Sequence, residues 1–274
     1  FADQLQTLPV NLFGISMGAA SLPTLSSQSG PDEREKFKET YLTSLHQTIY
    51  LVMPLSAILL VLRVPAIRLV YGVGNFPWEA TIRTAQTLAF FSISIFSQSA
   101  NYLTTRAFYA LKDTVTPVLI NIFTAIINIC ASIYFVNVLK LGVWSIAMAY
   151  ASTSMIDLFL LIHFLSKKVG GLDKKKLIVP FTKISLATGL MGIMLYIPMK
   201  LLDNYVLDTT RTINLIALTG VAGIVGMATY LLITHVLKVE EIQLFYKLLR
   251  KLKLSKSDIK AEAVDLATTE QETV

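Results

Sequence analysis

Apolar stretches about twenty residues long recur along the whole chain, and they restrict its fold more than any other feature of the sequence. A helix needs about twenty apolar residues to cross a bilayer. Charged residues make up only 15% of the 274 residues, whereas a soluble domain carries about 25%. The mean hydropathy is +0.60. We therefore predict an all-α, polytopic membrane helical bundle, because helices satisfy their own backbone hydrogen bonds in lipid.

The sequence divides into seven predicted membrane-spanning helices and a more polar C-terminal part. After the last span, Ile242, Phe245 and Leu249 recur at helical spacing among basic residues. Residues 238–254 are therefore predicted to form an amphipathic cytoplasmic helix on the inner leaflet. Residues 255–274 are polar and rich in Glu, Ala and Thr, and we expect a disordered tail there. The predicted spans are residues 8–25, 42–62, 82–111, 115–139, 143–165, 178–201 and 213–237.

Lysine and arginine residues cluster after every second predicted span. The positive-inside rule therefore places the ends of the odd-numbered spans and the C-terminus in the cytoplasm. The net charge of +6 suits anionic lipid headgroups better than nucleic acid. Because the chain starts at Phe1 and no signal peptide precedes the first apolar run, we also expect a fragment cut near a helix start. The cytoplasmic basic residues are Arg34, Lys36, Lys38, Lys112, Lys167, Lys168, Lys174, Lys175, Lys176, Lys238, Lys247, Arg250, Lys251 and Lys253, and the opposite loops hold Arg63, Arg68, Lys140 and Arg211.

Residue groups that catalyse reactions or bind metals are scarce in this sequence. The three histidines, His46, His163 and His235, are far apart and have no cluster of carboxylates or cysteines beside them. The single Cys130 lies within a span and excludes a disulfide inside the chain. Glycine-rich phosphate loops, nucleophile elbows and zinc-protease patterns are missing. We expect no catalytic residue, no metal site and no cofactor.

Polar residues inside the predicted spans are the stronger lead to function. Such residues are costly in hydrocarbon, so they either bond neighbouring helices together or line a path for a substrate or ion. For Asp157 the second interpretation gains weight, because a carboxylate in hydrocarbon needs a partner or a cavity. Its distance from the basic cytoplasmic end also allows it to reach the interface. The candidates are Asn11, Ser16, Gln98, Ser99, Asn101, Thr104, Asn121, Thr124, Asn128 and Asp157.

Residues 106–117 form a charged, aromatic turn between two apolar stretches. Residues 112–114 predict a tight cytoplasmic turn, in which Asp113 caps the next helix and Pro117 falls in its first turn. Arg106 lies about one and a half turns inside the third span, where it can reach a phosphate headgroup or a buried acid. The motif fits a purely structural, capped helical hairpin as well as a ligand site, and both interpretations stay open.

With these residues the chain resembles the MurJ/MviN family of the multidrug/oligosaccharidyl-lipid/polysaccharide (MOP) exporter superfamily. Further matches cover residues 2–5, 8–9, 12–16 and 22–26, residues 74–76 after the second span and, more weakly, residues 145–149. Together they span most of the first 157 residues, whereas the later spans match only in hydropathy. The family pattern of the turn is matched by Arg106, Phe108, Tyr109, Ala110, Asp113, Thr114, Thr116 and Pro117.

The resemblance implies a transporter of the bacterial cytoplasmic membrane with fourteen helices in two lobes. This chain would correspond to the eighth to fourteenth helices, the C-terminal lobe, and its N-terminal lobe would lie outside the chain. The family flips lipid II, an undecaprenyl-pyrophosphate-linked peptidoglycan precursor, to the outer leaflet by alternating access around a cationic cavity. The last two helices would form a groove for the lipid tail. Expected substrate-binding residues are Gln4, Asn11, Ser16, Asn101, Arg106, Tyr109 and Asp113, and candidates for an ion are Asn121, Asn128 and Asp157.

Three departures from the family pattern modify this expectation. Gln4 stands where the family commonly has an arginine that faces the cavity, and Thr7 replaces a nearby acid. Tyr150 stands where some members have a threonine implicated in ion binding. Arg106 is therefore the cation expected to matter most in this lobe. The alternatives are an exporter of another lipid-linked oligosaccharide or of a drug, a non-transporting scaffold half, and, last, a membrane transferase.

Overall fold

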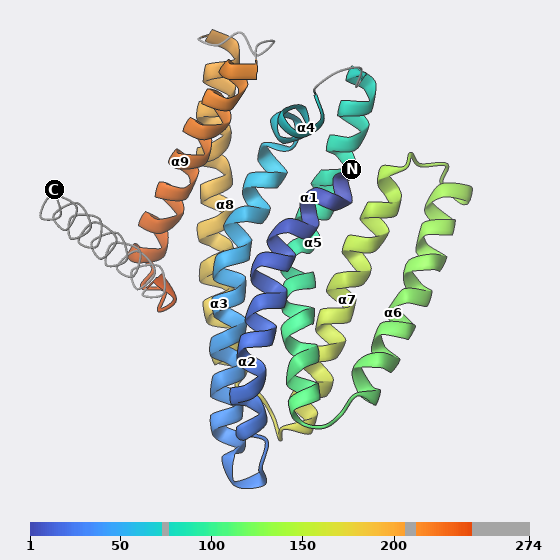
Figure 1. The fold of residues 1–274 in the computed structure, drawn as a ribbon, viewed down its shortest axis with the longest axis vertical. Coiled ribbons are helices and arrows are strands. Elements are labelled where there is room, and N and C mark those ends of the chain that lie inside the picture. Colours follow the sequence, from blue (N-terminus) through green and yellow to red (C-terminus); the bar gives the residue numbers. More distant parts are fainter. Residues whose placement is uncertain (73–76, 206–211, 243–274) are drawn as a thin grey trace, which may run out of the picture.

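The computed structural model describes residues 1–72, 77–205 and 212–242, and every regular element within these residues is helical (Figure 1). The prediction of an all-α helical membrane bundle is thereby confirmed. Within the same residues, six helical stretches are long and apolar enough to cross a membrane. The predicted total of seven spans stays a prediction, because the helix at the third predicted span is not among the six. The resembling motif at residues 74–76, residues 243–254 of the predicted amphipathic helix and the predicted tail lie outside the described residues.

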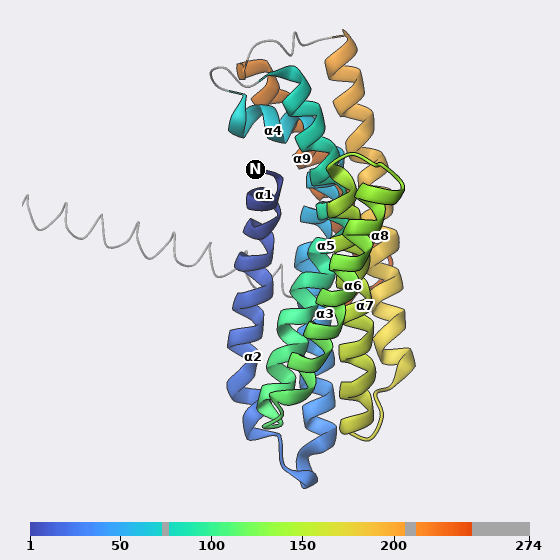
Figure 2. The ribbon, with the colours of Figure 1, turned by 90° about the vertical axis from the view of Figure 1, so that its right-hand side faces the viewer.

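The first membrane-length stretch is a continuous rod built from three segments. It comprises α1 (Ala2–Pro9), the π-helical turn η1 (Val10–Ile15) and α2 (Ser16–Ser27), and it runs along one side of the bundle (Figure 2). Gly14 allows the rod to approach its neighbour closely, since a Cβ atom there would lie 2.7 Å from the Cα atom of Ser99.

The second stretch begins with the 3-10 turn η2 (Pro31–Glu33) and continues as α3 (Arg34–Val61). The short helix α4 (Arg63–Tyr71) follows directly and lies across the end of the bundle (Figure 1).

Helix α5 (Trp78–Ala110), the long helix that is not among the six candidates, lies at the centre. It contacts α1, α2, α3, α4, α6 and α7. Its serines 92, 94, 97 and 99 are fully buried. Because other helices cover it, α5 needs fewer apolar side chains than a helix that faces lipid. This position explains why the third predicted span is less apolar than the six candidates.

The remaining helices flank this centre. Helix α6 (Val115–Ile133) continues into the π-helical turn η3 (Tyr134–Val138) and packs mainly on α7 (Trp144–Lys168). Helices α8 (Lys174–Tyr205) and α9 (Thr212–Val236) form a hairpin on the opposite side, which packs on α3 and contacts α4 (Figure 1). The main hydrophobic core joins α3, α5, α7 and this hairpin.

Candidate functional site

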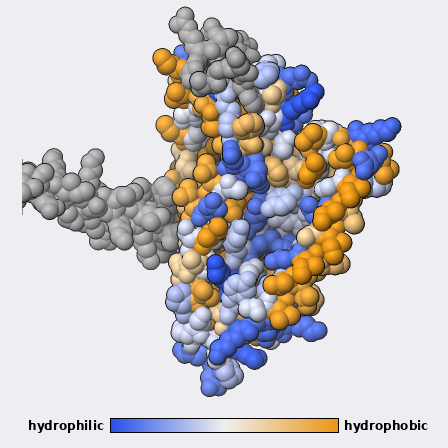
Figure 3. Space-filling model, turned by 45° about the vertical axis from the view of Figure 1, so that its right-hand side comes forward, coloured by the Kyte–Doolittle hydropathy of each residue, from blue (hydrophilic) through white to orange (hydrophobic). Residues whose placement is uncertain are grey.

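A polar cavity of about 580 Å³ lies between α5, α6 and α7. Figure 3 shows this side of the molecule, where hydrophilic residues fill a hollow beside a ridge of apolar side chains. The lining residues recur every three or four positions on each helix, which places them on a single helical face. They are Gln98, Asn101, Tyr102, Thr105, Arg106 and Tyr109 on α5, Asn121, Thr124, Ala125, Asn128 and Ile129 on α6, and Tyr150, Thr153, Ser154 and Asp157 on α7.

The structure brings six of the predicted site residues together in this cavity. Tyr102, Thr105 and Tyr150 also line the cavity but were not among the predicted site residues, and Gln98 was recognised only as an intramembrane polar residue. Gln98 and Thr105 lie three and four positions from Asn101 on α5, and Tyr102 lies four positions from Gln98, so helical spacing could have found these three. Tyr150 could have been found by the same spacing from Asp157 on α7. The six predicted residues are Asn101, Arg106, Tyr109, Asn121, Asn128 and Asp157.

Arg106 supplies the positive charge of the cavity lining. Its guanidinium lies 5.8 Å from the centre of the Tyr109 ring, a distance that suits a cation–π contact. Gly18 of α2 leaves room for the Arg106 alkyl chain, because a Cβ atom at residue 18 would lie only 3.3 Å from the Arg106 Cγ atom. Within the described residues, Arg106 forms no ion pair or hydrogen bond. Its charge is therefore available to an anion.

Asp157 supplies the negative charge of the same lining. The residue is only 9% exposed, and the Thr124 hydroxyl donates a hydrogen bond to its Oδ1 atom over 3.1 Å. No cation of the described residues lies within ion-pair distance of it. A buried carboxylate with a single hydroxyl partner can accept a hydrogen bond from a ligand or attract a cation.

Amide side chains connect the walls of the cavity. Asn128 donates to the Thr153 hydroxyl over 3.0 Å, and Asn101 donates to the Ser154 carbonyl over 3.2 Å. For these amide nitrogens, the interpretation as helix-to-helix hydrogen bonds is confirmed. The Asn101 Oδ1 atom is buried and has no hydrogen-bond partner, so it remains free to accept one.

A series of side-chain hydrogen bonds joins the cavity to α1. The Tyr150 hydroxyl donates to Gln98 over 3.1 Å, and Gln98 donates to the Oε1 atom of Gln6 over 2.9 Å. Gln6 is buried and in turn donates to Asp3 over 2.7 Å. The polar wall of the cavity is thus held in place by residues from three helices.

Three predicted site residues lie on the first rod, outside the cavity lining. Gln4 is exposed, and its Oε1 atom accepts a hydrogen bond from the Tyr71 hydroxyl over 2.9 Å. Asn11 and Ser16 are also exposed, and the Ser16 hydroxyl donates to the Asn11 carbonyl over 3.3 Å. The structure does not bring these residues together with Arg106 in the cavity.

Asp113 occupies the turn between α5 and α6, where its carboxylate is fully engaged. Its Oδ1 atom accepts the Thr116 N–H over 3.0 Å, which confirms the predicted cap. Its Oδ2 atom accepts bonds from the Thr116 hydroxyl over 2.7 Å and from Lys168 Nζ over 2.5 Å. Burial alone would raise the pKa of Asp113, but Lys168 and Thr116 outweigh it and lower the pKa to about 2. These contacts give Asp113 a structural role at this end of the bundle.

Catalytic and metal-binding groups were not expected from the sequence. Within the described part of the chain, no cluster of three or more His, Cys, Asp or Glu side chains could hold a metal ion. Asp157 is the acidic residue among the cavity lining and Arg106 the basic one. The arrangement therefore suits binding by charge and hydrogen bonds.

Comparisons with known proteins agree on one family. A family model described as "Lipid II flippase MurJ" matches residues 1–215. A "Probable lipid II flippase MurJ" of Bdellovibrio bacteriovorus is 26% identical over 242 residues, which cover 88% of this chain and 45% of that protein. A protein of the same description from Thermotoga maritima is 29% identical over 242 residues, covering 88% and 46%. The chain thus spans about half the length of the curated relatives it matches.

A solved structure shares the fold. It is described as "Lipid II flippase MurJ, inward closed conformation" and is 23% identical, with a TM-score of 0.69. The match covers 86% of this chain and 45% of that chain. The long helices of this chain therefore follow an arrangement already seen in a membrane protein.

Proposed function

Because the chain belongs to the MurJ family, we propose that it forms the C-terminal lobe of a flippase that carries lipid II from the inner to the outer leaflet by alternating access. An N-terminal lobe outside this chain would complete the transporter. Moving a lipid across a membrane breaks no covalent bond, so the proposed function assigns no catalytic residue. The activity would supply peptidoglycan precursors for cell wall synthesis.

The polar cavity with an unpaired Arg106 is the observation that carries this proposal. The headgroup of lipid II combines a pyrophosphate with sugars and a peptide. Arg106 offers a cation for the pyrophosphate, and the amides of Asn101, Asn121 and Asn128 offer hydrogen bonds for hydroxyl and peptide groups. Asp157, Asn121 and Asn128 are also the candidates for a coupling ion within this lobe.

The distribution of basic residues supports an orientation with the C-terminus in the cytoplasm. The turns that carry Lys112, Lys168 and Lys174 lie at one end of the bundle, together with the turn between α2 and α3 (Figure 1). Arg106 lies near the same end of α5, one turn before the helix ends at Ala110. The positive-inside rule puts this end in the cytoplasm, where the cargo is made.

The α8–α9 hairpin supports a role in holding the lipid tail. Apolar side chains on both helices are exposed, including Ile193 (59%) and Ile224 (72%). Cβ atoms added at Gly189, Gly220 and Gly223 would meet nothing within 4 Å, so these glycines leave the surface smooth. In contrast, a Cβ atom at Gly226 would lie 2.8 Å from the Leu195 side chain, and this glycine serves close packing.

Rescue of cells depleted of their lipid II flippase tests the proposal. The complete protein that contains this chain should restore growth and cell shape. Normal membrane insertion without rescue would contradict lipid II as cargo and favour an exporter of another lipid-linked oligosaccharide or of a drug. Insertion without any transport of lipid-linked substrates would favour a scaffold.

Variants of Arg106 separate ligand binding from structure. Arg106→Ala should abolish rescue with normal protein levels, whereas Arg106→Lys should keep part of the activity because it keeps the charge. Arg83→Ala is the matched control, since Arg83 is exposed and does not line the cavity. Its guanidinium pairs with the Glu79 carboxylate at a distance of 2.6 Å. Rescue by Arg106→Ala together with a reduced folded yield would make Arg106 a structural residue.

A further inference from the structure

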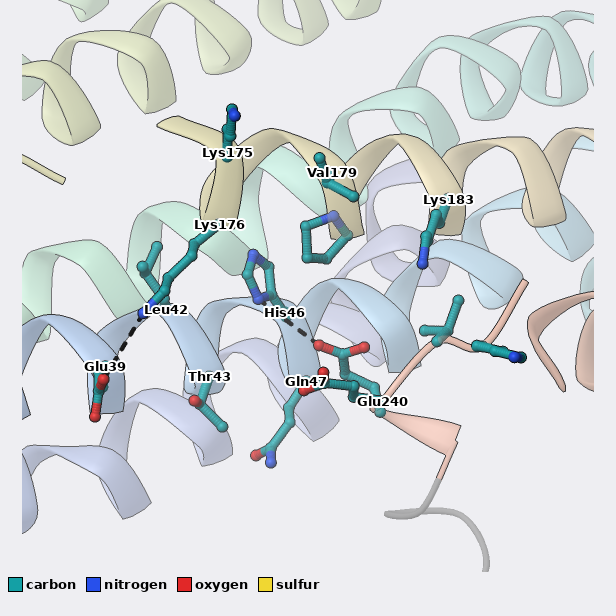
Figure 4. Close-up of a pocket in the computed structure, with 14 residues that line it drawn as sticks. Glu39, Leu42, Thr43, His46, Gln47, Lys175, Lys176, Val179, Lys183 and Glu240 are labelled. Atoms are coloured by element: carbon teal, nitrogen blue, oxygen red, sulfur yellow. Dashed lines mark ion pairs between the residues drawn. The ribbon is translucent and has the colours of Figure 1, made fainter. Parts of the chain in front are cut away.

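A second cavity of about 740 Å³ lies away from the proposed cargo site, between α3, α8 and the chain that follows α9. Figure 4 shows His46 of α3 between α8 and this following chain. Its charged lining combines Glu39 and His46 of α3, Lys175, Lys176 and Lys183 of α8, and Lys238, Glu240 and Glu241 after α9.

A base and an acid face each other in the wall of this cavity. The Nδ1 atom of His46 lies 3.7 Å from Oε1 of Glu241, and the two side chains are 8% and 11% exposed. The acid and base come from segments almost 200 residues apart in sequence. Burial removes most of the water that would otherwise screen or solvate either charge.

The chain after α9 turns back into the bundle at this pair. Lys238 has a φ of 51°, and the N–H of Val239 donates to the Thr234 carbonyl over 3.0 Å, which ends the helix. Val239 and Ile242 are only 2% and 8% exposed and belong to the main core. Glu241 is thus held inside the protein by apolar residues on both sides.

The surrounding charges do not neutralise Glu241. Lys176 pairs with Glu39 over 3.8 Å in an exposed contact at the rim. Lys175 points away from His46 (Figure 4). The positive charge of Lys183 lowers the pKa of Glu241, and the negative charge of Glu240 raises it. Burial raises the pKa of Glu241 above its usual value.

We propose that His46 and Glu241 form a proton-dependent clasp that holds the end of α9 against α3. The clasp is closed when the pair carries one proton, whichever residue holds it. Loss of that proton at high pH leaves a buried carboxylate beside a neutral imidazole, which is costly. A second proton at low pH leaves a buried imidazolium beside a neutral acid. Closure is therefore strongest at intermediate pH and weakens as pH rises.

The position of the clasp gives it a consequence for the α8–α9 hairpin. Apart from α8, α9 contacts α4 and α3 among the described helices. The clasp adds an attachment just beyond the C-terminal end of α9. Opening it frees this end of the hairpin while α8 stays packed on α3. The clasp is independent of the proposed cargo, because it shares no residue with the first cavity.

Reaction of a buried thiol measures opening of the clasp. Val239→Cys, in the complete protein with Cys130 and any other native cysteines replaced by serine, places a thiol at a buried position. The measured quantity is the ratio of its maleimide labelling rate to the rate for the exposed Glu240→Cys variant. Taking this ratio removes the intrinsic pH dependence of thiol reactivity. From pH 6 to pH 8.5 this ratio should rise, by at most about tenfold per pH unit for a single proton.

Two variants and a control decide the outcome. His46→Gln and Glu241→Gln should each flatten the pH dependence of the ratio, because neither amide titrates. Glu39→Gln, which breaks the exposed pair in the same cavity, should leave the dependence unchanged. A pH-independent ratio in the parent, or an equal slope in parent and His46→Gln proteins that are both monodisperse, would overturn the proposal.

Discussion

Replacing Gly14 with alanine tests whether the first rod reaches α5 only because residue 14 has no side chain. The added Cβ atom would lie 2.7 Å from the Ser99 Cα atom and 2.9 Å from its Cβ and Oγ atoms. The Cα atom belongs to the backbone of α5 and cannot rotate away, so one helix must move. The contact helps to position α5, which carries one wall of the cavity.

The expected cost combines two opposing effects. Overpacking a core position costs about 1–3 kcal/mol, and replacing glycine with alanine in a helix returns about 1 kcal/mol. Gly14→Ala should therefore destabilise the protein by about 0–2 kcal/mol, most of it from displacement of α5. By the scaling for soluble domains of similar size, this lowers the melting temperature by up to roughly 8 °C.

Two other glycines provide matched controls. A Cβ atom at Gly189 would meet nothing within 4 Å, so Gly189→Ala should be neutral or stabilising. A Cβ atom at Gly18 would lie 3.3 Å from Cγ of the flexible Arg106 side chain, so Gly18→Ala should fall between the other two. The assay is the fraction of monodisperse protein that remains in detergent after heating. Equal melting temperatures for all three variants, or a larger loss at Gly189, would refute the steric argument.

Three further substitutions test single contacts. Asp157→Asn keeps an acceptor for the Thr124 hydroxyl but removes the charge, so transport should fall at an unchanged melting temperature; unchanged transport would exclude a role for the carboxylate charge. The pKa of Asp113 is lowered, so its contribution to stability is present above pH 3.8 and is lost as pH falls toward about 2. Asp113→Asn should thus have a lower melting temperature than the parent at neutral pH, and this difference should disappear in acid. A difference that stays constant with pH would contradict the Lys168 contact. Tyr41→Phe removes the buried 3.0 Å bond to Thr104 and should cost about 1 kcal/mol, measured as a lower melting temperature, whereas an unchanged value would show that this bond adds nothing.

The sequence predicted the helices better than it predicted which polar residues meet. Hydropathy located the membrane-length helices, because each must be long and apolar on its own. The capping role of Asp113 was also predictable, because the cap and Thr116 are three residues apart. Arg106 and Asp157 could be recognised as unusual from their positions alone. Their common cavity could not be predicted, because it depends on how α5 and α7 pack.

The contacts that were missed are all between distant segments. Helix α5 was predicted as the third span, but its burial could not be, because it depends on neighbours from both sides of it in sequence. The pair of His46 and Glu241 joins residues of α3 and of the chain after α9. Nothing in the local sequence around His46 distinguishes it from a histidine that faces the membrane interface.

The polar character of α5 also restricts what can cover the cavity. The helix is shielded by neighbours over most of its surface. Three of its four buried serines, Ser92, Ser94 and Ser97, donate to backbone carbonyls about one turn away, as Ser92 does to Leu88 over 2.7 Å. Along the cavity this shielding ends, and Arg106 faces open space. A surface with such a cation, and with Asp157 opposite, is too costly to face lipid tails. It must meet either water or a second polar surface. A second polar surface that encloses a hydrated chamber with this one satisfies the requirement, and lipid tails packed against the cavity do not.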